Sequence, residues 1–163
     1  MTFTPVTLCF LIRDLGGRRQ VLLGLKKTGF GRGKIVGLGG HVEPGESDAE
    51  AACREVQEEA GLTVRQADLR DAGLVRFEFP ARPEWNMASR LFTTRIWGGE
   101  PSESPEIIPE WFDVDSLPLE HMWQDALYWL PAALAGGIID VVIVLNDDNE
   151  TVLKVRDYSQ SGH

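Results

Sequence analysis

The sequence is poor in cysteine and contains no long apolar run. Only Cys9 and Cys53 occur among its 163 residues, which excludes a disulfide-rich scaffold and a CxxC metal or redox site. No apolar stretch approaches the ~20 residues that a transmembrane helix needs. The N-terminus lacks the basic start and the small-residue cleavage site of an export signal. We therefore expect a cytoplasmic protein that makes no contact with a membrane.

Positive charge is scarce as well. Sixteen lysines and arginines oppose 25 aspartates and glutamates, so the net charge is −9, whereas a protein that binds nucleic acid polymers is usually basic. The imbalance is uneven: residues 1–40 hold seven basic residues and one acid, and the remaining 123 residues hold nine and 24. Such a division indicates an anionic ligand that metal cations help to bind, although scattered solvated charge is the alternative.

The composition, 43% hydrophobic and 25% charged, is typical of a globular protein, and the length suits one domain. We expect this domain to span residues 1–158, followed by a loose tail at 159–163. Residues 4–12 and 20–25 are predicted strands joined by a Gly16-Gly17 turn. Further strands are expected at 74–79, 89–97, 110–114, 138–145 and 151–155. Residues 124–135 are expected to form a helix, which Pro131 would kink or divide. The fold class is thus α/β.

A second helix is predicted at residues 48–60. Ser47 and Glu50 have the spacing of a capping box, and Gly61 supplies a C-terminal stop. Small and apolar side chains recur at helical spacing and should form the buried face: Ala49, Ala52, Cys53, Val56 and Ala60.

The same helix carries three carboxylates on one arc. Glu55 and Glu59 lie one turn apart, and Glu58 flanks them. At neutral pH they repel one another, and a bound Mg²⁺ or Mn²⁺ would remove this repulsion because hard cations prefer carboxylate oxygens. On this spacing alone, a solvated acidic helix face is the alternative interpretation.

The residues around the helix complete a longer pattern, G-x₅-E-x₇-R-E-U-x-E-E-x-G-U, where U is aliphatic. Its specified positions are Gly40, Glu46, Arg54, Glu55, Val56, Glu58, Glu59, Gly61 and Leu62. This pattern is the Nudix box, and on it the chain resembles a Nudix hydrolase. The resemblance implies an α/β/α sandwich with a mixed sheet, in which the box forms a metal-binding loop–helix–loop.

The resemblance also implies roles for the residues of the box. The carboxylates of Glu55, Glu58 and Glu59 and the backbone carbonyl of Gly39 would ligate Mg²⁺, which Mn²⁺ could replace. Arg54 would orient the glutamates, and Glu46 would hold Arg54 or a metal-bound water. The residue that takes a proton from the attacking water is either Glu58 or Glu106. Glu106 could instead be a further metal ligand or a solvated loop acid.

Outside the box, the chain resembles the MutT-like branch that hydrolyses oxidised purine nucleoside triphosphates. In that branch Trp123 would stack on the purine and Asp125 would bond its edge, while Thr7 and Lys26 would line the pocket. Simple packing of Trp123, a helix-dipole role for Asp125 and an edge-guarding role for Lys26 are the alternatives. The other expected substrate-binding residues are Leu38, Gly40 and His41, the last of which could touch phosphate or lie free on the surface.

Two positions depart from the mammalian members of that branch. Ala126 replaces a second acid, and Val36 replaces an asparagine on the pocket floor. Because both changes remove polar contacts to the base, we expect a weaker preference for oxidised purines.

The sequence therefore predicts a Mg²⁺-dependent pyrophosphohydrolase of nucleoside triphosphates, such as 8-oxo-dGTP, that acts as a monomer or homodimer. A hydrolase of nucleoside-diphosphate sugars or ADP-ribose is the first alternative. A non-catalytic nucleotide sensor is the second, although binding alone would not need all three glutamates and Arg54.

Overall fold

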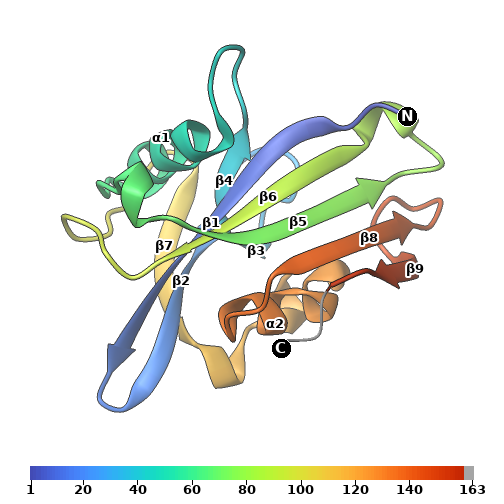
Figure 1. Ribbon diagram of the computed structural model, residues 1–163. Helices are drawn as coiled ribbons and strands as arrows, with labels where there is room; N and C mark the ends of the chain where they lie inside the picture. The colour runs from blue at the N-terminus through green and yellow to red at the C-terminus, as the bar shows by residue number, and fades with distance from the viewer. Residues whose placement is uncertain (160–163) are drawn as a thin grey trace.

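The computed structural model describes residues 1–159 and consists of a mixed β-sheet with helices on both sides (Figure 1). The strands are β1 (Thr4–Leu15), β2 (Arg18–Lys26), β3 (Ile35–Val36), β4 (Leu38–His41), β5 (Arg70–Glu78), β6 (Met87–Thr94), β7 (Ile107–Asp113), β8 (Ile139–Leu145) and β9 (Val152–Asp157). The α-helices are α1 (Asp48–Ala60) and α2 (Leu130–Leu134). Short 3₁₀ helices are η1 (Gln66–Asp68), η2 (Pro83–Trp85), η3 (Val114–Ser116), η4 (Leu119–His121) and η5 (Gln124–Tyr128). This arrangement confirms the expected α/β class.

Strand β1 joins two parts of the sheet. The strand order is β3-β2-β1-β6-β5-β8-β9, with β4 also paired to β1 and β7 to β2. The β1–β6 and β5–β8 pairs are parallel, and the others are antiparallel. The first part of β1 pairs with β4 and β6, whereas its last four residues pair with β2 across the predicted Gly16-Gly17 hairpin. One strand thus holds β4, which leads into α1, against the centre of the sheet.

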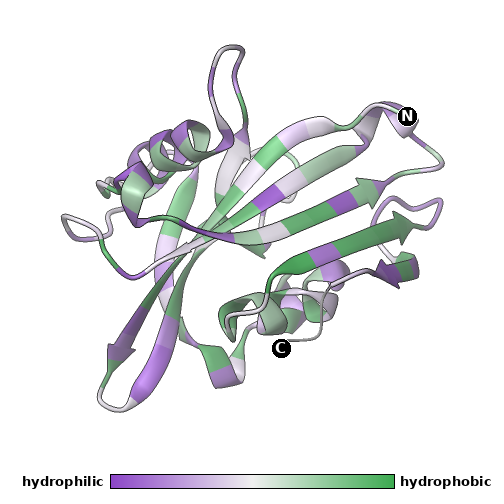
Figure 2. Ribbon diagram, viewed as in Figure 1, coloured by the Kyte–Doolittle hydropathy of each residue, from purple (hydrophilic) through white to green (hydrophobic). Residues whose placement is uncertain are grey.

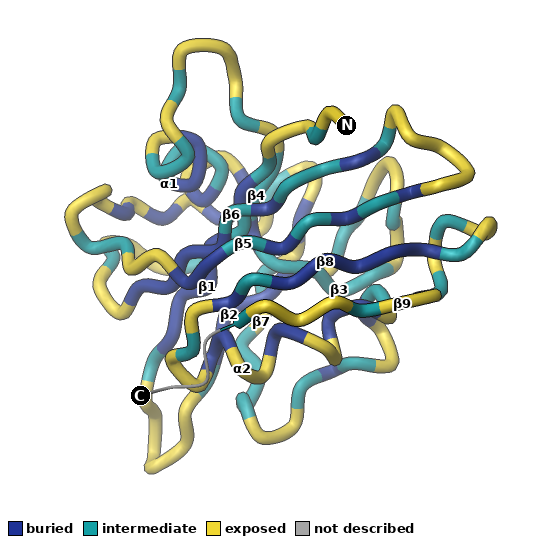
Figure 3. The backbone as a smooth tube through the Cα atoms, turned by 45° about the vertical axis from the view of Figure 1, so that its right-hand side comes forward, coloured by how far each residue is buried: buried dark blue, intermediate teal, exposed yellow. Residues whose placement is uncertain are grey.

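The core lies on both faces of this sheet. Cys9 and Leu11 pack with Val56 of α1 on one face, and Phe10 and Ile12 pack on the other face with the residues around α2. Since both faces are covered there, residues 8–12 of β1 are all apolar and show no alternation. Figures 2 and 3 show the apolar, buried stretches gathered in the central strands, with exposed residues at the turns.

The box helix is confirmed as expected. Ser47 and Glu50 form both hydrogen bonds of the capping box, and Gly61 adopts the left-handed conformation (φ 70°) that ends the helix. The prediction of its buried face was partly wrong. Ala51 is fully buried, whereas Ala49 and Cys53 are only half-buried against the core.

Several boundaries differ from the expected ones. Strand β7 begins at Ile107 and includes Pro109, which an edge strand tolerates because its missing N–H is not needed for a second neighbour. Strand β6 ends at Thr94, before the expected residue 97. The predicted helix at 124–135 is divided at Trp129, whose φ of −142° is not helical, and Pro131 lies in the first turn of α2.

Of the expected tail at 159–163, the structure describes only Ser159. Ser159 Oγ accepts a hydrogen bond from the backbone N–H of Asp140 at 2.9 Å, and residues 160–163 lie outside the described part of the chain. Within residues 1–159, no helix combines the length and apolar character required to span a lipid bilayer.

Candidate active site

Arg54 connects the loop before α1 to the acidic face of that helix. Its guanidinium donates to both carboxylate oxygens of Glu46, with N–O distances of 2.6 and 3.0 Å. It also donates to Glu55 at 3.0 Å, to Glu58 at 3.3 Å and to the backbone carbonyl of His41 at 3.0 Å. Such multiple charge-assisted bonds fix the orientation of the carboxylates. The geometry therefore suits the orienting role expected of Arg54 and the holding role expected of Glu46.

Glu59 is the buried member of the acidic cluster. Only 8% of the residue is exposed, and one carboxylate oxygen accepts the N–H of Gly39 at 2.7 Å. Burial raises the pKa of Glu59 to about 8, and the charges of Glu55 and Glu106 act in the same direction. Burial also raises the pKa of Glu55, although its bond to Arg54 opposes the increase. Negative charge on these two side chains is therefore costly unless a cation accompanies it.

Glu106 reaches the same region from a distant part of the chain. It directly precedes β7, which pairs with β2, and its backbone carbonyl accepts the N–H of Lys27 at 2.8 Å. Its charge raises the pKa of both Glu55 and Glu59. The charge of Glu106 therefore acts on two carboxylates of the box helix, and its expected role as a base or a metal ligand stays a prediction.

The chemistry of these side chains fits a divalent metal ion. The cluster offers hard oxygen donors with excess negative charge, which Arg54 offsets only in part. Among residues 1–159, no three His, Cys, Asp or Glu side chains converge as a ready-made metal site. Glu55 and Glu58 face Arg54, and Glu59 faces Gly39. Binding of a metal through all three would therefore require these carboxylates to turn.

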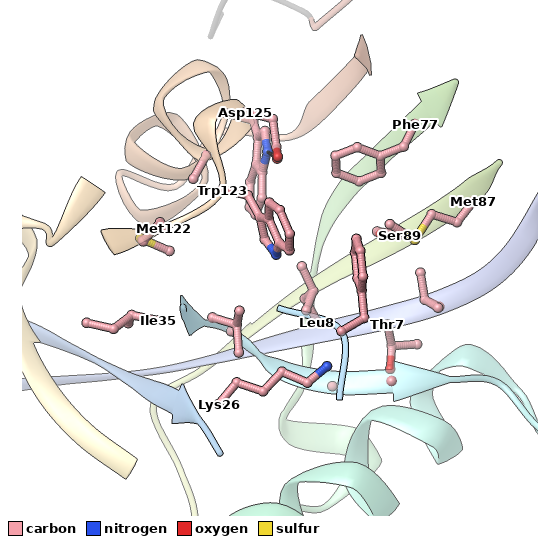
Figure 4. A pocket seen from close by; sticks show the side chains of 18 of the residues that line it. Thr7, Leu8, Lys26, Ile35, Phe77, Met87, Ser89, Met122, Trp123 and Asp125 are labelled. Carbon is pink, nitrogen blue, oxygen red and sulfur yellow. Dashed lines mark hydrogen bonds between the residues drawn. The ribbon is translucent and has the colours of Figure 1, made fainter. Parts of the chain in front are cut away.

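An apolar cavity of about 360 Å³ adjoins the acidic cluster. Figure 4 shows Trp123 and Asp125 on one side of this cavity and Thr7 and Lys26 on the opposite side. Gly39, Gly40, His41 and Glu59 also line it, so the cavity is continuous with the box. Leu38 is placed differently, because its side chain is fully buried in the core beside α1 and does not line the cavity.

The glycines of β4 permit this close arrangement. A Cβ on Gly39 would lie 1.8 Å from the backbone oxygen of Thr7, and one on Gly40 would lie 2.7 Å from the carboxylate of Glu55. Neither position has room for a side chain, so β4 brings its backbone directly between the cavity and α1.

Aromatic residues close one end of the cavity. The ring of Phe30 stacks on Trp123, with centroids 5.1 Å apart and an interplanar angle of 18°. The Lys34 ammonium lies 4.8 Å from the Trp123 ring, and Trp85 meets the edge of Phe30. Phe30 is 62% exposed, so it covers Trp123 from the solvent side. An aromatic base that stacks on this face of Trp123 would have to take the place of Phe30.

Sequence reasoning missed several residues that line the cavity: Phe77, Met87, Ser89, Asn149 and Glu150. The first three come from strands β5 and β6, where they read as ordinary core positions. The last two belong to the turn between β8 and β9. That turn is recognisable from the sequence, but its position beside Trp123 depends on tertiary packing.

Asp125 lies at the base of the cavity with one partner. It is 7% exposed, and its carboxylate accepts the indole N–H of Trp129 at 2.8 Å. Burial raises the pKa of Asp125, and the bond from Trp129 opposes the increase. Ala126 and Val36 line the same cavity and add no polar group beside Asp125.

The raised pKa of Asp125 predicts how its replacement affects stability. The folded protein binds the proton of the Asp125 carboxyl more tightly than the unfolded chain does. The contribution of Asp125 to the free energy of unfolding therefore falls as pH rises above 3.8, the ordinary pKa of this side chain. Asp125→Asn keeps an acceptor for Trp129 and cannot ionise. Its free energy of unfolding relative to the wild type should therefore increase between pH 4 and pH 8, as measured by urea denaturation. A difference that is constant across this range would contradict the prediction.

Comparison with known proteins identifies the family. Residues 2–133 match the NUDIX domain model. The oxidized purine nucleoside triphosphate hydrolase of Danio rerio is 44% identical over 132 residues, which cover 81% of each chain. The enzyme of the same name from Mus musculus is 42% identical over 116 residues, covering 71% of this chain and 72% of the mouse protein.

Solved structures show the same fold. The MutT protein from Bacillus halodurans superposes with a TM-score of 0.77 at 27% identity, over 96% of this chain and 98% of its own. The NUDIX domain of Shewanella oneidensis NrtR, solved with ADP ribose, has a TM-score of 0.67 over 83% of this chain and 88% of its own. Its 13% identity shows a likeness of fold alone. Together with the complete box, these findings show that the chain belongs to the Nudix family of hydrolases, which cleave phosphoric anhydride bonds and generally use divalent metal ions.

Proposed function

We propose that this protein is a Mg²⁺-dependent pyrophosphohydrolase of purine nucleoside triphosphates, including oxidised ones such as 8-oxo-dGTP. The observation that carries the proposal is the continuity of the aromatic cavity with the acidic cluster, because Gly39 and Glu59 belong to both. A base beside Trp123 would then have its phosphates directed toward the box. The names of the zebrafish and mouse relatives support the same substrate class.

In the proposed reaction, water attacks a phosphorus atom of the triphosphate, and the products are the nucleoside monophosphate and pyrophosphate. Mg²⁺, held by Glu55, Glu58, Glu59 and the carbonyl of Gly39, with Glu106 as a further ligand, would neutralise the phosphates. Arg54 and Glu46 keep the carboxylates in position. Glu58 or Glu106 would accept the proton of the attacking water. Lys26 and His41, on the cavity wall, would face the phosphates.

We further propose that residues 1–158 act as one domain in the cytoplasm, as a monomer or homodimer, on free nucleotides and not on nucleic acid polymers. A nucleotide panel with Mg²⁺, with products separated by chromatography, tests the substrate assignment. Release of pyrophosphate from purine triphosphates supports it. Cleavage of ADP-ribose or nucleoside-diphosphate sugars in preference would replace it, and binding without turnover would indicate a sensor.

Trp123 and Asp125 should affect substrate selection in different ways. Stacking contributes roughly 1–3 kcal/mol per base whatever the base, so Trp123→Ala should raise KM for all purine triphosphates by about 10-fold. Asp125→Ala should instead narrow the ratio of kcat/KM between 8-oxo-dGTP and dGTP, because a lost hydrogen bond affects only bases that use it.

Leu127→Ala, at an exposed position of the same 3₁₀ helix, is the matched control for Asp125→Ala. It should leave the ratio of kcat/KM between the two substrates close to that of the wild type. An unchanged ratio in Asp125→Ala would show that Asp125 does not read the base.

A further inference from the structure

An unpaired amide lies on the cavity wall outside the segment that matches the Nudix domain model. Among residues 1–159, two buried side-chain polar atoms have no hydrogen-bond partner, Thr7 Oγ1 and Asn149 Oδ1, and both residues line the cavity. Thr7 is already among the expected pocket residues. Asn149 lies in the turn between β8 and β9, beyond the matched residues 2–133. A buried acceptor without a donor is unfavourable by itself and is satisfied by water or by a ligand.

The turn that carries Asn149 is held in one conformation. Asp148 accepts the N–H groups of Glu150 and Thr151 at 2.9 Å each, together with the Thr151 hydroxyl at 2.7 Å. The Asn149 N–H donates to the carbonyl of Asn146 at 2.9 Å. These bonds fix the backbone that carries the Asn149 side chain. A group on a fixed backbone loses less conformational freedom when a ligand binds to it.

Two long-range contacts fix this turn against the cavity. Glu150 pairs with Lys34 at 3.1 Å, and the Lys34 ammonium lies over the Trp123 ring. The N–H of Val152 donates to the side chain of Gln124 in η5, the residue that follows Trp123. The turn is therefore connected both to the glycine-rich loop and to the 3₁₀ helix that carry the aromatic end of the cavity.

We propose that the Asn149 carbonyl oxygen accepts a hydrogen bond from an N–H group of the substrate's purine and so helps to determine which purine is preferred. This proposal rests on the proposed function. The chemistry follows from what the cavity offers: Ala126 and Val36 supply no polar group, whereas Asn149 Oδ1 is an acceptor with no donor. Purines differ in the N–H groups along their edges, and an acceptor therefore discriminates between them.

The backbone of Asn149 allows a clean test. Its φ of 59° is left-handed, a conformation that glycine adopts without strain. Asn149→Gly should therefore remove the amide and preserve the turn, with a melting temperature close to that of the wild type. Asp147→Ala, at an exposed position of the same turn, is the matched control.

Binding of dGMP, 8-oxo-dGMP and dAMP should be measured by calorimetry in the presence of a chelator, so that the readout does not depend on catalysis. Asn149→Gly should raise the Kd of the tightest-bound purine monophosphate by about 3- to 10-fold. It should also change the ratios of Kd among the three monophosphates. Asp147→Ala should alter neither. The same change in ratio should appear in kcat/KM of the triphosphates with Mg²⁺, through KM and not through kcat.

The outcomes separate this inference from the proposed function. If Asn149→Gly raises the Kd of all three monophosphates equally, or raises none of them, the role of Asn149 is overturned while the protein remains a purine triphosphate hydrolase. A wild-type protein that neither binds nor hydrolyses purine nucleotides would overturn the proposed function, and the role of Asn149 with it.

Discussion

Replacement of Glu58 by glutamine is expected to reduce kcat by about 10²-fold or more while leaving the fold intact. The Glu58 side chain is 57% exposed, and its contact is a 3.3 Å bond to Arg54, so glutamine preserves its size and costs little stability. The same change removes a negative charge and a proton acceptor from the box. Steady-state kinetics with the best substrate, alongside a thermal melt, measure both effects.

The kcat of Glu106→Gln tests whether Glu106, the second candidate, is the general base. A loss comparable to that of Glu58→Gln would identify Glu106 as a participant in the chemistry, and a small loss would leave it a neighbouring charge. Glu100→Gln, at an exposed loop position, should behave as the wild type. Nearly normal kcat in Glu58→Gln would contradict the catalytic role given to the box helix.

Removal of divalent metal should abolish turnover, and Mg²⁺ or Mn²⁺ should restore it. Burial and like charges raise the pKa values of Glu55 and Glu59, so a cation that binds there relieves an unfavourable arrangement. The metal should then raise the melting temperature, since an ion at 100 times its Kd stabilises the folded state by about 2.7 kcal/mol.

Activity in excess EDTA, its recovery with Mg²⁺, and melting curves at several metal concentrations check this prediction. Ca²⁺ separates binding from catalysis, because it can stabilise the fold through the same oxygens without supporting the reaction at the same rate. Full turnover in excess chelator would exclude the metal-dependent mechanism.

The part of the site that lies on α1 could be predicted from the sequence because its signals are local. Ser47, Glu50 and Gly61 determine where the helix begins and ends, and the 3.6-residue period then places Glu55 and Glu59 on one arc. Most strands can be recognised by composition, but β3 and β4, in the glycine-rich segment, are not among the expected strands. Their ends were less certain, as at β7, because pairing with a neighbour and not the segment itself decides where a strand stops.

The remainder of the site depends on long-range packing. The charge of Glu106 acts on Glu55 and Glu59 because β7 pairs with β2, and no local pattern records that pairing. Phe30 covers Trp123 because of the path taken by the glycine-rich loop. Leu38 was expected at the substrate but packs beneath α1, because the alternation of β4 directs its side chain away from the cavity.

The two walls of the cavity differ in the space they leave for substitutions. Strand β4 leaves no space between Thr7 and Glu55, so even one added methyl group at Gly39 or Gly40 would disturb the cavity and the acidic cluster together. The opposite wall is formed by η5 and the β8–β9 turn, whose residues can change without crossing that boundary. Substitutions in the C-terminal part of the chain can therefore reshape that wall of the cavity without disturbing the packing of β4 against Thr7 and Glu55.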